Sequence, residues 1–136
     1  MSCTIDTSVW VSALLRGEPH NEQAYDFLTS AIQNNEDIIL PTTVPIELAM
    51  ALGRRGESES SAKVLKFLFS IPALHFAEIT NQRMVDIIAT AAPLMLRGMD
   101  AIIVAVAYEF GCRLVTLDQE IARKALPLVE IVNLGG

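Results

Sequence analysis

Residues 98–118 read GMDAIIVAVAYEFGCRLVTLD, and this stretch predicts a helix that leads almost directly into a strand. The apolar run from Asp100 to Phe110 has the length of a helix, and Gly111 ends it. Residues 114–117 form a short β-rich run, and Asp118 follows them at once. A helix joined to a strand in this way is typical of an α/β protein, so the stretch decides the fold class.

The same alternation continues outward to both ends of the chain. We expect the other strands at residues 3–5, 38–40, 75–79 and 129–132. We expect the other helices at residues 24–32, 44–52, 62–70 and 81–96. The second and third of these would form a hairpin hinged at the polar residues 53–60. The sequence therefore predicts one domain, residues 1–136, built as an α/β sandwich with a mostly parallel sheet.

Composition and charge narrow the possible functions. The chain is 51% hydrophobic and carries a net charge of −6. This acidic balance argues against a broad basic face for nucleic acid, because such binding needs Lys and Arg to replace counterions. We expect no secretory signal, and the apolar runs fall short of the ~20 residues that span a membrane, so a cytoplasmic protein without membrane contact is predicted. Cys3 and Cys112 have no metal-ligand spacing and are expected to be reduced core thiols.

Four acidic residues share a topological position in the predicted fold. Asp6 and Asp118 directly follow predicted strands, Glu47 lies in the first turn of the helix after the second strand, and Asp100 opens the apolar helix. In an open parallel sheet the carboxyl ends of strands and the helix N-termini lie along one edge, where ligands bind. We therefore expect these four side chains to converge.

Each acid taken singly has a simpler interpretation, because Asp often caps helices and the helix dipole favours acids in a first turn. Glu47 and Asp100 argue against that interpretation, since they interrupt the apolar stretches PIELAMAL and MDAIIVAVAY. Burying carboxylates side by side is unfavourable unless a cation binds there. Hard oxygen ligands without matching His or Cys indicate Mg²⁺ or Mn²⁺ rather than zinc.

Three segments together resemble the PIN domain family, specifically the small stand-alone ribonucleases that act as VapC toxins of toxin–antitoxin pairs. They are IDTSVWVSALL (residues 5–15), PTTVPIELAMAL (residues 41–52) and RGMDAIIVAVAYEFGCRLVTLDQEI (residues 97–121). The resemblance covers essentially the whole chain. It implies a three-layer α/β/α sandwich with a central sheet of four to five strands, and a Mg²⁺- or Mn²⁺-dependent endoribonuclease. It also implies a homodimer and a small antitoxin partner.

The resemblance assigns roles to individual residues. Asp6, Glu47 and Asp100 would hold the principal divalent ion, and Asp118 would complete the site or bind a second ion. Three hydroxyls would position ligands or water by hydrogen bonds, namely those of Thr7, Ser8 and Thr116. If the four acids face cations, the rest of the surface is close to neutral. Several basic residues are then candidates for contacts with RNA phosphates: Arg16, Arg54, Arg55, Arg97, Arg123 and Lys124.

Two further features concern regions away from the acids. Trp10 is expected in the core of the first helix rather than as a platform for RNA bases. The helical hairpin carries an apolar surface, which we expect at a dimer interface: Val64, Leu65, Leu68 and Ile71 on one stripe, with Phe67 and Phe69 beyond it. The alternative is that the stripe packs under the hairpin in the same chain. Glu120 is an additional acid beside Asp118, either at the surface or as an outer ligand.

Two other functions are disfavoured by the sequence and two remain open. A phosphoaspartyl hydrolase would need a second Asp two residues after Asp6, where Ser8 stands. A structure-specific DNA nuclease would need extra length for a clamp over the DNA. A catalytically silent binding module, and an RNA-processing nuclease without an antitoxin, both fit the same residues.

Overall fold

The computed structural model describes residues 1–136, except for the side chain of residue 58. The described residues form one five-stranded sheet in which every pair of neighbours is parallel. Its strands are β1 (Ser2–Ile5), β2 (Asp37–Pro41), β3 (Leu74–Ala77), β4 (Arg113–Thr116) and β5 (Ile131–Asn133). The order in the sheet is β3-β2-β1-β4-β5, so the chain reverses its direction of travel between β1 and β4. Such a reversal opens a crevice at the carboxyl ends of the two strands.

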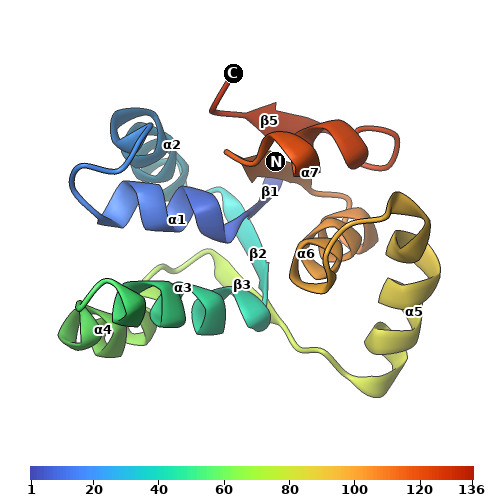
Figure 1. Ribbon diagram of the computed structural model, residues 1–136, viewed down its shortest axis with the longest axis horizontal. Helices are drawn as coiled ribbons and strands as arrows, with labels where there is room; N and C mark the ends of the chain where they lie inside the picture. The colour runs from blue at the N-terminus through green and yellow to red at the C-terminus, as the bar shows by residue number, and fades with distance from the viewer.

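Helices cover both faces of this sheet (Figure 1). One side carries α1 (Thr7–Leu14), α2 (Asn21–Gln33), α3 (Thr43–Arg54) and α4 (Ser58–Phe69). The other side carries α5 (Asn81–Ala91), the 3₁₀ turn η1 (Ala92–Leu94) and α6 (Gly98–Glu109), while α7 (Gln119–Lys124) lies beside β5. This distribution follows from right-handed crossovers, which place connecting helices on opposite faces when the chain changes direction. The predicted α/β/α sandwich is confirmed.

Trp10 lies at the centre of the core between the sheet and α1–α4. Its side chain is fully buried, and the indole Nε1–H donates a hydrogen bond to the carbonyl of Ile5 at 3.1 Å. The surrounding core is made of aliphatic residues from strands and helices alike, including Ile38, Leu48 and Leu114. The expectation of a core tryptophan is confirmed. Cys3 and Cys112 are both buried and free, as predicted.

Several predicted boundaries differ from those in the structure. The third strand covers 74–77 rather than 75–79, and the fifth covers 131–133 rather than 129–132. The helix expected at 81–96 ends at Ala91, because Pro93 lies in a 3₁₀ turn that Met95 closes with a positive φ of 59°. The hinge of the helical hairpin is only residues 55–57, since α3 continues to Arg54 and α4 starts at residue 58.

The apolar stripe expected at a dimer surface is mostly internal. Val64, Leu68 and Ile71 are buried within this chain, and of the four predicted residues only Leu65 is exposed. The stripe faces α3 and the sheet, because the hairpin folds back onto the same core. Three residues of the stripe therefore pack under the hairpin in the same chain, whereas Phe67 and Phe69 beyond it are exposed.

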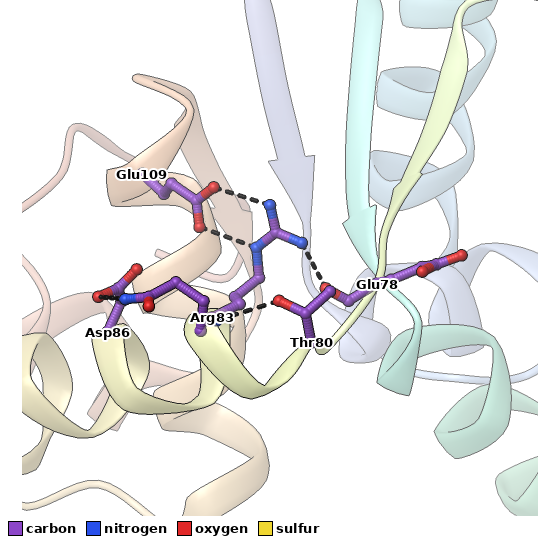
Figure 2. A network of polar contacts seen from close by, with 6 residues as sticks. Glu78, Thr80, Arg83, Asp86 and Glu109 are labelled. Carbon is purple, nitrogen blue, oxygen red and sulfur yellow. Dashed lines mark hydrogen bonds and ion pairs between the residues drawn. The ribbon is translucent and has the colours of Figure 1, made fainter.

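A polar network holds α5 against α6 on the opposite side of the sheet (Figure 2). The guanidinium of Arg83 donates two hydrogen bonds to the carboxylate of Glu109, at 2.9 and 2.8 Å, and a third to the carbonyl of Glu78. It also lies over the ring of Phe110, 5.4 Å from the centroid. Thr80 caps α5 by accepting a hydrogen bond from the backbone N–H of Arg83. These contacts fix the C-terminal end of α6, whereas Asp100 lies in the first turn of the same helix.

Across the described residues, no single helix is both long and apolar enough to cross a membrane. Residues 81–94 and 98–109 reach the necessary length only together, as a pair bent by 108°.

Candidate active site

The four predicted acids line one cavity of about 430 Å³ at the carboxyl edge of the sheet. Asp6 follows β1 and Asp118 lies two residues after β4, so both stand beside the crevice where the strand order reverses. Glu47 reaches the cavity from α3, and Asp100 reaches it from the first turn of α6. The expected convergence of these residues is therefore what the structure shows.

Asp6 lies at the floor of this cavity. Only 6% of the residue is exposed, and its Oδ2 accepts hydrogen bonds from the hydroxyls of Ser8 (2.7 Å) and Thr116 (3.0 Å). Burial raises the pKa of Asp6 above its ordinary value; the two hydroxyls oppose this shift, while the charges of Glu47 and Asp118 add to it. The structure shows no hydrogen bond from a backbone N–H of the first turn of α1 to this carboxylate, so Asp6 does not act as a helix cap.

Glu47 and Asp100 approach Asp6 from the two faces of the sheet. The hydroxyl of Thr7 donates a hydrogen bond of 2.5 Å to Oε1 of Glu47. Glu47 lies in the second turn of α3 rather than the first, because the helix begins at Thr43 and its first turn holds no acid. Burial raises the pKa of Asp100 to about 6, and the charges of the other three acids add to the shift. These carboxylates are thus held together against their mutual repulsion.

Asp118 has a structural role as well as a place in the cavity. Its Oδ1 accepts hydrogen bonds from the backbone N–H groups of Glu120 (2.8 Å) and Ile121 (3.1 Å), which caps α7. The hydroxyl of Thr116 in turn accepts a hydrogen bond from the N–H of Asp118 at 2.9 Å. Thr116 therefore connects Asp6 to Asp118 through its single hydroxyl. The capping interpretation is correct for Asp118, although its carboxylate also lines the cavity.

The donor set fits a hard divalent cation. Carboxylate and hydroxyl oxygens line the floor of the cavity, and no cysteine contributes to its lining. Among the described residues, no group of three or more His, Cys, Asp or Glu side chains is placed so that all of them could hold one metal ion. Mg²⁺ does not require such a group, because it retains several waters and binds through one or two carboxylates. Asp6, Glu47 and Asp100 are the residues whose chemistry suits it.

Basic side chains lie only on parts of the rim. Of the six candidates for phosphate contacts, Arg54 and Arg55 line the cavity, and Arg97 lies near enough to lower the pKa of Asp100. Arg16 lines a different pocket, beside α4. Lys124 pairs with Glu120 at 3.0 Å and also donates to the carbonyl of Met95. Glu120 is exposed and does not line the cavity, so it is a surface residue.

The connection between α1 and α2 supplies part of the rim that the sequence did not reveal. Glu18 and His20 line the cavity, and Glu18 forms an ion pair with Arg55 at 2.7 Å. Two side-chain contacts hold this connection in place: Ser12 Oγ donates to the carbonyl of Pro19 (2.5 Å), and Asn21 Nδ2 donates to the carbonyl of Ser12 (2.7 Å). Neither rim residue follows a strand or interrupts an apolar run, so no local pattern indicated it.

Comparisons with known proteins identify the family and the fold. Residues 3–126 match the model of the family described as PIN domain. Among curated proteins, no sequence matches the chain. Three similar solved structures are VapBC2 from Rickettsia felis bound to a DNA fragment from their promoter, FitAcB from Neisseria gonorrhoeae, and VapC20 from Mycobacterium tuberculosis, a Sarcin-Ricin loop cleaving toxin.

All three structures share the fold of this chain over nearly its full length. VapBC2 and FitAcB each have 18% identity and a TM-score of 0.72, and the match covers 98% of both chains in each case. VapC20 has 19% identity and a TM-score of 0.71, over 94% of this chain and 97% of its own. At such identities the likeness establishes the fold, and the chemistry must be argued from the cavity itself.

Proposed function

Because the chain belongs to the PIN domain family, we propose that it is a metal-dependent endoribonuclease that hydrolyses RNA phosphodiester bonds. The observation that carries the proposal is the set of four acids in one cavity, two of them with raised pKa values, beside the reversal point of a parallel sheet. Such an arrangement is costly for folding alone and useful for binding a cation. The whole chain, residues 1–136, would act as one nuclease domain.

The proposed roles follow from the contacts of each residue. Asp6, Glu47 and Asp100 would hold Mg²⁺ or Mn²⁺, and Asp118 would complete the site. Thr116 orients Asp6 and Asp118 through its hydroxyl, and Thr7 does the same for Glu47. A bound divalent cation would supply Lewis-acid chemistry, polarising the phosphodiester and making a water molecule more acidic. The pKa of Asp100 is raised in the metal-free protein, and a bound cation would favour the ionised form of this carboxylate.

We also propose that the protein is the toxin of a VapBC-type pair. The similar structures support this proposal, since VapBC2 was solved bound to a DNA fragment from its promoter and FitAB was solved bound to an IR36 DNA fragment. The acidic cavity would accept an Arg or Lys side chain of a small antitoxin, which would pair with the carboxylates and displace cation and RNA. The expected consequence is growth arrest when the chain is expressed alone and relief when the neighbouring gene is co-expressed.

Sequencing of RNA ends after a brief pulse of expression tests activity and substrate together. We expect new ends at defined sites with the wild-type chain and none with Asp6→Asn. Unchanged growth and total RNA in the cell, together with RNA cleavage by the purified protein, would reject the toxin and keep the nuclease. That outcome would favour an RNA-processing enzyme without an antitoxin.

The alternative is a catalytically silent binding module that acts through protein partners. Titration with Mn²⁺ separates the two functions, because the enzyme should bind the ion saturably and then cut RNA. A chain that does neither would be a binding module. The retention of all four acids in one cavity favours the enzyme.

A further inference from the structure

Two arginines, Arg54 and Arg55, line the cavity, and the proposed metal site gives neither of them a role. Three residues of α3 lie on one stripe of the helix, because Glu47, Ala51 and Arg54 are separated by four and then three positions. All three line the cavity. About 10 Å of helix axis separates the acid from the arginine. The small side chain of Ala51 lies between them and leaves the cavity open along this stripe.

Arg54 and Arg55 differ in how their charges are used. Arg55 forms the ion pair with Glu18, so its charge is largely compensated at the rim. Within the described part of the chain, the guanidinium of Arg54 has neither a hydrogen bond nor an ion pair, although five acids line the same cavity. Arg54 lies in the last turn of α3, where the helix dipole slightly stabilises a positive charge. This stabilisation does not depend on which way the side chain points, so it does not explain why Arg54 lines the cavity.

On the basis of the proposed function, we propose that Arg54 binds a backbone phosphate of the RNA next to the one that is cleaved. An acidic protein that binds RNA needs positively charged side chains near the RNA phosphates, because binding releases counterions when Lys or Arg takes their place. The RNA would then lie along α3, with its scissile phosphate at Glu47 and a flanking phosphate at Arg54. Glu18 reduces the contribution of Arg55, so the two adjacent arginines should contribute unequally.

Binding of a short fluorescein-labelled single-stranded RNA of mixed sequence tests this inference. The measurement uses the full chain carrying Asp100→Asn, so that the probe is not cut, and it compares Arg54→Gln, Arg55→Gln and Lys66→Gln. Lys66 is an exposed cation of α4 outside the cavity and serves as the matched control for loss of one charge. Fluorescence anisotropy at several salt concentrations gives both the Kd and its salt dependence.

We expect Arg54→Gln to raise the Kd about three- to tenfold and to reduce the slope of log K against log salt by about 0.7, the value for one phosphate of a single strand. Arg55→Gln should have a smaller effect, and Lys66→Gln should change neither quantity. In the active chain, Arg54→Gln should raise KM more than it lowers kcat.

An Arg54→Gln effect no larger than that of Lys66→Gln, in a chain that still binds and cuts RNA, would overturn this inference alone. A wild-type chain that neither binds nor cuts RNA would overturn the proposed function and the inference together. The two failures are therefore distinguishable.

Discussion

Asp100 shows how a carboxylate placed in this cavity affects the stability of the fold. Its pKa is raised to about 6, so its proton is bound more tightly in the folded chain than in the unfolded one. Its ionisation therefore removes stability as the pH rises from about 4 to about 6. The metal-free protein should be more stable below this interval than above it, as far as Asp100 determines the balance.

We predict that Asp100→Asn raises the Tm of the metal-free protein at pH 7. Solvent reaches this partly exposed residue, so the gain should be about 1 kcal/mol rather than the larger value that the shift alone implies. The gain should vanish below about pH 4, and excess Mn²⁺ should reverse it by stabilising the wild type more. Thermal unfolding in chelator across this pH range measures it, and a lower Tm of the variant at pH 7 would contradict it.

Cys3 illustrates the opposite case of a buried group without chemistry. Burial raises the pKa of its thiol to about 12, and the nearby charge of Glu36 adds to the shift. We expect Cys3 and Cys112 to react with a thiol reagent only after unfolding, because the thiolate is the reactive form. Mass spectrometry after alkylation with and without denaturant checks this. Rapid labelling of the native chain would show that β1 opens readily.

At the scale of elements, the α3–α4 hairpin shows what helical periodicity reveals and what it does not. The spacing correctly placed Val64 and Leu68 on one buried face of α4, and Ile71, just beyond the end of this helix, is buried as well. Whether that face meets the same chain or a second copy depends on how the hairpin folds back, and no local pattern encodes this. The sequence therefore predicted the helix but not its environment.

Substitutions in this hairpin should follow burial. Leu68 is fully buried, so Leu68→Ala should lower the free energy of unfolding by about 2–5 kcal/mol. Leu65, which is 48% exposed, should lose much less than that on the same change. Denaturant unfolding of both variants provides the comparison. Equal losses would mean that the hairpin packs differently in solution.

The hydrogen bonds of Arg83 connect α5 to Glu109 at the end of α6. These hydrogen bonds lower the pKa of Glu109, and a lowered pKa contributes stability that is lost as the pH falls through the folded value. We predict that Arg83→Ala lowers the free energy of unfolding by about 1–2 kcal/mol at neutral pH, since it removes a bidentate pair and a contact with Phe110.

Arg83→Lys is the matched control for this prediction, because it keeps the charge and loses the fork geometry. It should recover only part of the stability. Full recovery would show that the charge alone matters, and an unchanged stability in Arg83→Ala would mean that the network contributes nothing measurable.

At the scale of the whole molecule, the topology explains which parts of the site were predictable. Asp6 and Asp118 were found because they directly follow predicted strands, and Glu47 and Asp100 because they interrupt apolar stretches. The parallel sheet then brings these four positions together without further information. The rim residues Glu18 and His20 were missed because their place depends on how a connection between two helices folds.

The oligomeric state remains a prediction that rests on the family resemblance. We expect a homodimer, since homodimers are common among small globular proteins. Val64, Leu68 and Ile71 are buried within the chain and do not support it, whereas Leu65, Phe67 and Phe69 are exposed on the same hairpin. Light scattering at micromolar concentration measures the molar mass, and a monomer at every concentration would contradict the expectation.

Cleavage of RNA by the purified chain tests the central claim most directly. The measurement compares the wild type with Asp6→Asn, with Mn²⁺ or with chelator, after circular dichroism has shown that both proteins are folded. We predict cleavage by the wild type only when Mn²⁺ is present, and a loss of at least about 100-fold in Asp6→Asn, because the central carboxylate of the cavity is neutralised. Full activity of folded Asp6→Asn, or equal activity of the wild type in chelator, would contradict the assignment of this cavity as a metal-dependent ribonuclease site.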